Sequence, residues 1–167
     1  MNSTIISEPS TNRFEEELLQ VEPISLNEYV PFFLGSIANR WTAVSSKAYR
    51  SKFKLGIGEW RILASLAVTV EATALEITTL LKMDSGHVSR AMRVLEKRKL
   101  VQPVPGRFAG RNKPYMLTEQ GVVAFSEMKT MALAREQKLL APLDDEQRKL
   151  LLDLLGHLYG HLDEIES

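Results

Sequence analysis

The chain has 167 residues, 44% of them hydrophobic, which is enough to bury a core in one domain or in one domain with helical extensions. It contains no cysteine, so disulfides, thiolate metal sites and thiol redox switches are excluded. The formal net charge is +0, but residues 82–113 carry nine basic and two acidic side chains, so this segment is +7 and the rest is −7. A basic segment on an acidic body is typical of proteins that bind phosphate backbones.

The amino-terminal residues have no basic region before an apolar run, and no apolar run reaches membrane-spanning length. We therefore expect a cytoplasmic protein without a signal peptide. Residues 1–22 are polar and acidic, and we expect a flexible arm there, with a short helix at Phe14–Leu19. Ser25 and Glu28 fit a capping box, but Pro31 leaves two possibilities open: a continuous helix from Ser25, or a turn followed by a new helix.

Helical periodicity continues from residue 32 to residue 70, with a break at Gly56 and Gly58. In the first helix an apolar residue recurs every three or four positions (Phe33, Ile37, Trp41, Val44 and Ala48). The second helix covers Glu59–Val70. A capping box at Thr73 and Glu76 then opens a short helix, in which we expect Leu75, Leu80 and Leu81 to pack inward.

The stretch from Asp84 to Leu100 predicts a helix with two unlike faces. One face is apolar (Val88, Ala91, Met92 and Leu95), and the opposite face carries Arg90, Arg93 and Lys97. Asp84 fits an N-cap, which leaves Ser85 and Gly86 at a narrow helix tip suited to the major groove of DNA. The alternative is an ordinary helix with a solvated basic face. Two short helices in succession, the second basic, are the sequence form of a helix-turn-helix.

A β-hairpin is predicted directly after this helix. Val101–Val104 and Tyr115–Leu117 fit two strands, with Pro103 at a sheet edge, and residues 105–114 between them are basic and rich in turn residues. A helix-turn-helix followed by a basic hairpin is a winged helix. Arg107 and Arg111 would then contact the minor groove or phosphates, unless the hairpin tip is simply a solvated loop.

Two helices complete the chain. Thr118 fits the N-cap of a long helix that ends by Pro142, and Asp144 fits the cap of the last helix. In that last helix leucine and isoleucine follow a seven-residue rhythm (Leu151, Leu155, Leu158, Leu162 and Ile165), and this stripe is broader than one short helix needs. It implies a partner, and the simplest partner is a second copy of the chain.

Two other classes of protein fit parts of the sequence. An enzyme is disfavoured because the chain has neither a nucleophile elbow nor a phosphate-binding loop, and no cofactor is expected. His157 and His161 have the i, i+4 spacing of a two-histidine metal site, with Asp153 and Asp163 nearby, but spacing fixes no third ligand and surface histidines are the simpler explanation. A helical adaptor that binds other proteins through its leucines, without binding DNA, is the second alternative.

Several short motifs resemble the multiple antibiotic resistance regulator (MarR) family. They are Ser89–Arg90, Val94–Glu96, Leu100–Val101, a basic loop ending near Arg111, and Leu117–Gly121. The resemblance covers Gly58 to Gly121 most strongly. It implies a mainly α fold with a small β-hairpin wing, in which a winged helix-turn-helix domain is joined to N- and C-terminal dimerisation helices.

The resemblance also implies an organisation and a function. Residues 1–22 would be the arm, 23–55 an N-terminal dimerisation helix, 56–120 the DNA-binding domain and 121–167 the C-terminal dimerisation helices. The protein would be a homodimer that binds a pseudo-palindromic operator and regulates transcription, as a repressor released by a small aromatic acid. Family wings commonly carry an aspartate that braces the wing arginine, and this chain has Ala109 there, so the resemblance supports the contacts of Arg90 and Arg93 more strongly than that of Arg111.

The candidate site residues form two groups. The DNA-binding group is Ser85, His87, Ser89, Arg90, Arg93, Lys97, Arg107, Arg111 and Lys113. The candidate ligand-binding group is Ser36, Arg40, Trp41 and Trp60, in which an arginine among aromatic rings would bind a carboxylate while the rings cover its body. The alternative for the second group is that both tryptophans are core residues and Arg40 pairs with a surface acid.

Overall fold

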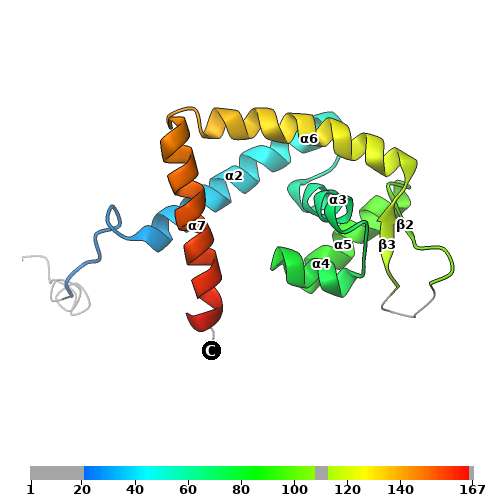
Figure 1. Ribbon diagram of the computed structural model, residues 1–167, viewed down its shortest axis with the longest axis horizontal. Helices are drawn as coiled ribbons and strands as arrows, with labels where there is room; N and C mark the ends of the chain where they lie inside the picture. The colour runs from blue at the N-terminus through cyan, green and yellow to red at the C-terminus, as the bar shows by residue number, and fades with distance from the viewer. Residues whose placement is uncertain (1–20, 108–112, 166–167) are drawn as a thin grey trace, which may run out of the picture. The chain divides into compact units, whose positions relative to one another are not determined.

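The computed structural model describes residues 21–107 and 113–165, and these residues are mainly α-helical with one small antiparallel sheet (Figure 1). The chain divides into two units, residues 1–43 and 44–167, and the first long helix begins in one and ends in the other. In chain order the elements are α2 (Val30–Phe53), α3 (Ile57–Thr69), β1 (Glu71–Ala72), α4 (Ala74–Leu81), α5 (Ser85–Lys97), β2 (Val101–Pro103), β3 (Tyr115–Leu117), α6 (Glu119–Leu139) and α7 (Asp145–Ile165). The fold class predicted from the sequence is confirmed. The helix expected at Phe14–Leu19, and nearly all of the expected arm, lie outside the described residues.

The approach to α2 settles the choice that Pro31 left open. Residues 26–28 form a turn, in which the Glu28 N–H donates to the Ser25 carbonyl at 3.0 Å. α2 begins only at Val30, so Pro31 lies in the first helical turn, where its missing N–H leaves no hydrogen bond unmade. A turn followed by a new helix is therefore what forms.

Helices α3, α4 and α5 pack together around one core in the second unit (Figure 1). Its fully buried side chains come from all three helices: Ile62, Leu63, Leu66, Ile77, Val88 and Leu95. The inward packing predicted for α4 is wrong for Leu75 and Leu80, which are 63% and 52% exposed, whereas Leu81 is half-buried. α4 has only eight residues, and it buries just the face that carries Ile77.

Side-chain caps fix where the short helices begin. The Thr73 hydroxyl accepts from the Glu76 N–H at 3.2 Å, and the Glu76 carboxylate accepts from the Thr73 N–H at 2.7 Å. Asp84 caps α5 by accepting from the His87 N–H at 2.8 Å. Both N-caps were predicted from the sequence and are confirmed. Each satisfies N–H groups that the first helical turn leaves without a carbonyl partner.

The capping box on α4 should make stability depend on pH. Hydrogen bonds from the backbone and side chain of Thr73 lower the pKa of Glu76 from its ordinary value of 4.5. A carboxylate whose pKa is lower in the folded state contributes stability above its unfolded pKa and loses that contribution as pH falls through the folded pKa. Urea unfolding at about pH 7 and about pH 3 should therefore show a smaller pH-dependent loss in Glu76→Gln than in the wild type. Equal losses would contradict this assignment.

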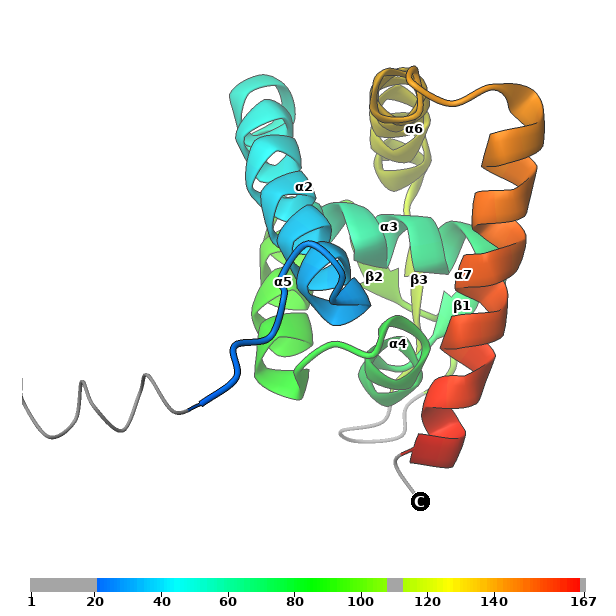
Figure 2. The same ribbon diagram turned by 90° about the vertical axis from the view of Figure 1, so that its left-hand side faces the viewer.

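The wing is a three-stranded sheet rather than the two-stranded hairpin expected from the sequence. Its strand order is β1-β3-β2, so the two-residue strand β1 was missed. Glu71 on β1 pairs in register with Met116, and Pro103 on β2 pairs with Tyr115. β2 is an edge strand, as its proline predicted. β1 and β3 contact α3, and β2 contacts α5 (Figure 2).

The start of α6 packs against the short segment that joins α5 to β2. Thr118 caps α6 by accepting from the Gly121 N–H at 3.0 Å, as predicted, and its hydroxyl donates to the Lys99 carbonyl at 2.6 Å. Gly121 is buried, and a Cβ atom added there would lie 1.9 Å from the Leu100 carbonyl oxygen. Glycine is thus required at position 121 because the backbone of α6 touches the backbone at Leu100. This contact and the Thr118 hydrogen bond fix the start of α6 against the residues that precede β2.

The last helix exposes nearly all of its apolar surface. Asp144 caps α7 through the Gln147 N–H at 2.8 Å, as predicted. From residue 149 to residue 165 every side chain that the structure describes is exposed. Its apolar side chains lie on more than one face: Leu150, Leu151, Leu152, Leu154, Leu155, Leu158, Tyr159, Leu162 and Ile165. A helix that is apolar on several faces is normally buried against other helices.

Within the described residues, no helix has both the length and the apolar character required to cross a lipid bilayer.

Candidate nucleic-acid interface

The two faces predicted for α5 are both present. Its apolar residues are buried: Val88, Ala91, Met92 and Leu95. The predicted DNA-binding residues of this helix are all exposed: Ser85, His87, Ser89, Arg90, Arg93 and Lys97. The helix is thus fixed by its buried face, and it presents its cations and small polar residues on the surface of the unit.

The arginines of α5 are folded back along their own helix. A Cβ atom added at Gly86 would lie 3.2 Å from a terminal nitrogen of Arg90, so the guanidinium covers the first helical turn. Arg93 donates to the Ser89 carbonyl from Nε at 3.3 Å and to the Ser89 hydroxyl at 3.4 Å. These contacts lie within one helical turn, so each guanidinium can turn outward by side-chain rotation alone.

The cations of α5 have no carboxylate partner in the part of the chain that the structure describes. No ion pair joins Arg90, Arg93 or Lys97 to an acidic side chain there. Their positive charge is balanced by solvent ions, which phosphate groups of DNA would displace. The face of α5 is therefore electrostatically available to an anionic partner.

His87 is placed differently from its neighbours. A Cβ atom added at Gly58 would lie 2.5 Å from His87 Nε2, so the imidazole rests against the backbone of α3. Gly58 is buried and permits this approach because it has no side chain. His87 therefore contacts α3 as well as solvent, and its predicted contact with DNA stays a prediction.

The two wing cations that the structure describes, Arg107 and Lys113, have acidic partners. Arg107 forms an ion pair and hydrogen bond with Glu71, and Lys113 Nζ lies 3.8 Å from Glu96 Oε1. Lys113 also lies 5.0 Å from the centroid of the Tyr115 ring. Its hydrogen bond with Tyr115 raises the pKa of Lys113, with a smaller contribution from Glu96. Arg111 and Ala109 lie outside the described residues.

One further cation of the basic segment has a structural role. Arg98 donates to the Phe53 carbonyl at 2.7 Å and to the Lys54 carbonyl at 3.2 Å, at the end of α2. A guanidinium at a helix carboxyl end satisfies carbonyls that have no partner in the helix. This partner is 45 residues away in sequence, so no local pattern could have predicted it.

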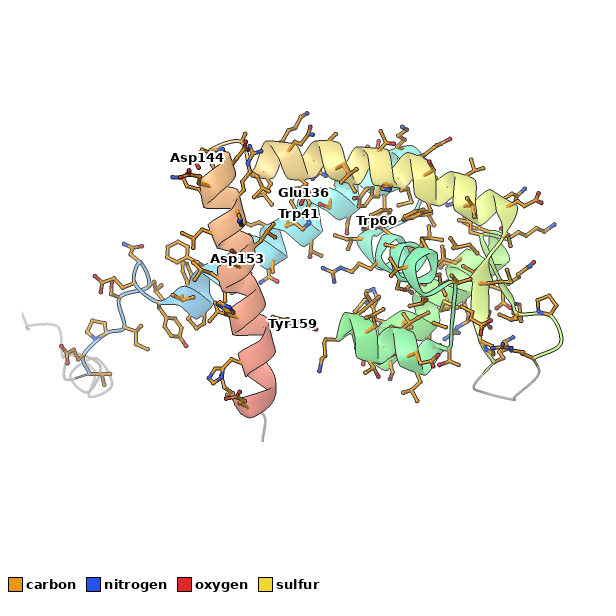
Figure 3. The ribbon with its side chains drawn as sticks, viewed as in Figure 1. Trp41, Trp60, Glu136, Asp144, Asp153 and Tyr159 are labelled. Carbon is orange, nitrogen blue, oxygen red and sulfur yellow. The ribbon has the colours of Figure 1, made fainter. Side chains whose placement is uncertain are left out.

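The candidate ligand residues are divided between the two units. Ser36 and Trp41 are half-buried and Arg40 is exposed, all on the part of α2 in the first unit. Trp60, labelled in Figure 3, lies on α3 in the second unit. Its ring stacks on that of Phe125 on α6 with 5.6 Å between the centroids, and the centroid of the Tyr49 ring lies 5.9 Å away. Trp60 is half-buried and packs against aromatic rings of its own unit, and the ligand site stays a prediction.

The histidines of α7 show no metal-binding arrangement within the described residues. His157 and His161 are both exposed, and His161 Nδ1 lies 3.0 Å from Glu164 Oε2. The described part of the chain contains no group of three histidine or acidic side chains placed to hold a metal ion.

Comparison with known proteins identifies the fold. No family model and no curated protein matches the sequence. Among solved structures, a MarR/EmrR family transcriptional regulator from Acinetobacter sp. ADP1 superposes with a TM-score of 0.77 at 28% identity, over 84% of this chain and 99% of that one. A MarR family transcriptional regulator from Silicibacter pomeroyi DSS gives a TM-score of 0.71 at 24% identity. That match covers 81% of this chain and 90% of the other. A mutant MarR from E. coli complexed with operator DNA gives a TM-score of 0.68 at 19% identity. That match covers 81% of this chain and 99% of the other.

These neighbours are transcriptional regulators, which are not enzymes, in agreement with the expectation for this chain. They share its arrangement of a helix-turn-helix, a small wing and flanking helices over nearly the whole of their own length. The resemblance drawn from Ser89–Arg90 and Leu117–Gly121 is therefore supported by a match in fold over 84% of the chain. The chain therefore has the winged helix-turn-helix fold of the MarR-family transcriptional regulators to which it is similar.

Proposed function

We propose that the protein is a homodimeric, sequence-specific DNA-binding repressor that a small aromatic acid releases from its operator. The observation that carries the DNA-binding part is the exposed face of α5, where Arg90, Arg93 and Lys97 lie without acidic partners among the described residues. A helix with this face matches the recognition helix of a helix-turn-helix, whose side chains contact base edges in the major groove. A structural neighbour complexed with operator DNA supports the same assignment.

The apolar surface of the flanking helices supports dimerisation. α7 exposes leucines on several faces, and in the first unit Phe33, Leu34 and Ile37 are between 43% and 53% exposed. So much exposed apolar surface is rare on a monomer and marks an interface. A two-fold dimer would pair two recognition helices, and operator half-sites about one turn of DNA apart, roughly 34 Å, would then be read together.

Salt-dependent binding tests the DNA-binding proposal directly. With three unpaired cations on each α5, a dimer would neutralise up to about six phosphates, and affinity should fall about 10³-fold between about 50 and about 200 mM salt. Fluorescence anisotropy with duplex DNA measures this slope, and multi-angle light scattering measures the oligomeric state. A helical adaptor would dimerise or bind proteins but would show little affinity for duplex DNA at low salt. Such a result would overturn the proposal in favour of the adaptor.

The effector part of the proposal depends on Arg40 and Trp41. A guanidinium next to an aromatic ring can hold a carboxylate while the ring covers an apolar body. The ligand would act by preferring a dimer whose half-site spacing does not fit the operator. Calorimetry with benzoates and cinnamates, together with DNA release, tests this. Absence of heat and of DNA release across that panel would reject an aromatic acid as the effector.

A further inference from the structure

The ion pair between Arg107 and Glu71 joins the wing to a strand that local sequence did not reveal. Arg107 follows the turn after β2, and its side chain is 62% exposed. Glu71 lies on β1, the opposite edge strand of the sheet, and its side chain is 36% exposed. The two residues are 36 positions apart in the sequence. The pair is on the surface, where a phosphate group could reach the guanidinium.

We propose that Glu71 competes with DNA phosphate for Arg107, so that it weakens DNA binding by the wing. The inference rests on the proposed DNA-binding function and deepens it. In the free protein the Glu71 carboxylate occupies a hydrogen-bonding edge of the Arg107 guanidinium. A phosphate that takes the same edge must displace the carboxylate, and a phosphate that binds beside it meets a second negative charge.

The physical consequence follows from how cations contribute to DNA binding. A cation releases condensed counterions only to the extent that its own charge is free to neutralise a phosphate. Arg107 is already paired with a carboxylate of its own chain. Its contribution to the slope of log affinity against log salt concentration should therefore be smaller than that of one full phosphate contact. The exposed pair is weak enough that phosphate can displace the carboxylate, because solvent and salt screen exposed ion pairs.

The effect should not depend on DNA sequence. Contacts with phosphate fix the position of a protein on the duplex and do not distinguish bases. Glu71 would therefore lower affinity for every sequence to a similar degree. Its role would be to restrain non-specific attachment, and base discrimination would be left to α5.

The test measures binding of the full chain to a mixed-sequence duplex across a salt series. Glu71→Gln keeps the size of the side chain and removes its charge. The gain in affinity of the variant over the wild type should be larger at about 50 mM salt than at about 200 mM. The difference should reach up to about 3-fold per protomer, because one full added phosphate contact steepens the salt slope by about 0.9. Glu127→Gln, an exposed glutamate on α6, changes the net charge equally and should leave the slope unchanged.

A double-mutant cycle shows whether the effect acts through Arg107. In an Arg107→Gln background, Glu71→Gln should no longer raise affinity, because the cation that it releases is absent. Weaker binding by Glu71→Gln would overturn the inference and assign Glu71 the role of holding Arg107 in its binding position. A gain that persists without Arg107 would overturn it in favour of general charge repulsion. If the wild type shows no salt-dependent binding at all, the proposed function fails; if it binds and Glu71→Gln is identical, only this inference fails.

Discussion

Replacement of Arg90 by alanine should abolish specific operator binding while leaving the protein folded. Arg90 is exposed, its guanidinium covers the first turn of α5 beside Gly86, and no acidic partner holds it among the described residues. A bidentate contact of arginine with a base edge contributes about 1–3 kcal/mol of discrimination, so loss from both protomers would remove about 2–6 kcal/mol. Stability should change by no more than about 0.5 kcal/mol, because the side chain is not part of the core.

The binding measurement uses operator DNA that has been selected with the wild-type protein. Dissociation constants for operator and mixed-sequence duplexes, with urea unfolding of the same samples, separate recognition from folding. Lys129→Ala removes one exposed positive charge from α6 and is the matched control. A folded Arg90→Ala variant with normal operator affinity would contradict the assignment of α5 as the recognition helix.

The substitution with the largest expected effect on stability is Gly121→Ala. Within a helix this change normally stabilises by up to about 1 kcal/mol. Here the added Cβ would lie 1.9 Å from the Leu100 carbonyl oxygen and 3.0 Å from its carbon, and both are backbone atoms. The Leu100 carbonyl also accepts from the Thr118 N–H at 3.1 Å, so it cannot move without loss of that hydrogen bond. We expect a loss of about 3 kcal/mol or more, as for overpacking in a core.

The same substitution elsewhere in the chain supplies the control. A Cβ atom added at Gly160 on α7 meets no described atom within 4 Å. Gly160→Ala should therefore be neutral or stabilising by up to about 1 kcal/mol. Urea midpoints at unchanged m-value report both effects. A Gly121→Ala protein as stable as Gly160→Ala would show that α6 and the Leu100 carbonyl are not in contact.

Features of the fold that depend on neighbours within a helical turn were predictable. Asp84, Thr73 and Thr118 were each predicted as N-caps, and each makes the expected hydrogen bond. The separation of Arg90 from Leu95 on opposite faces of α5 followed from periodicity alone. The reason is geometric: caps and helix faces are set by residues three or four positions apart, whatever the rest of the chain does.

Features that join distant parts of the chain were decided only by tertiary structure. Periodicity alone could not select Ile77 over Leu75 as the buried residue of α4, because the choice depends on where α3 and α5 lie. Arg98 was counted with the cations of the basic segment, yet it caps α2 through carbonyls 44 and 45 residues away.

The sequence by itself thus determined that one helix carries a cationic face, where the capped helices α4, α5, α6 and α7 begin, and which protein family the chain resembles. The tertiary structure determined which cations have acidic partners. Arg90 and Arg93 stay without acidic partners among the described residues, whereas Arg107 meets Glu71 across the sheet. The physical reason is that an ion pair depends on distance in space, and strand pairing brings together charges that lie far apart along the chain.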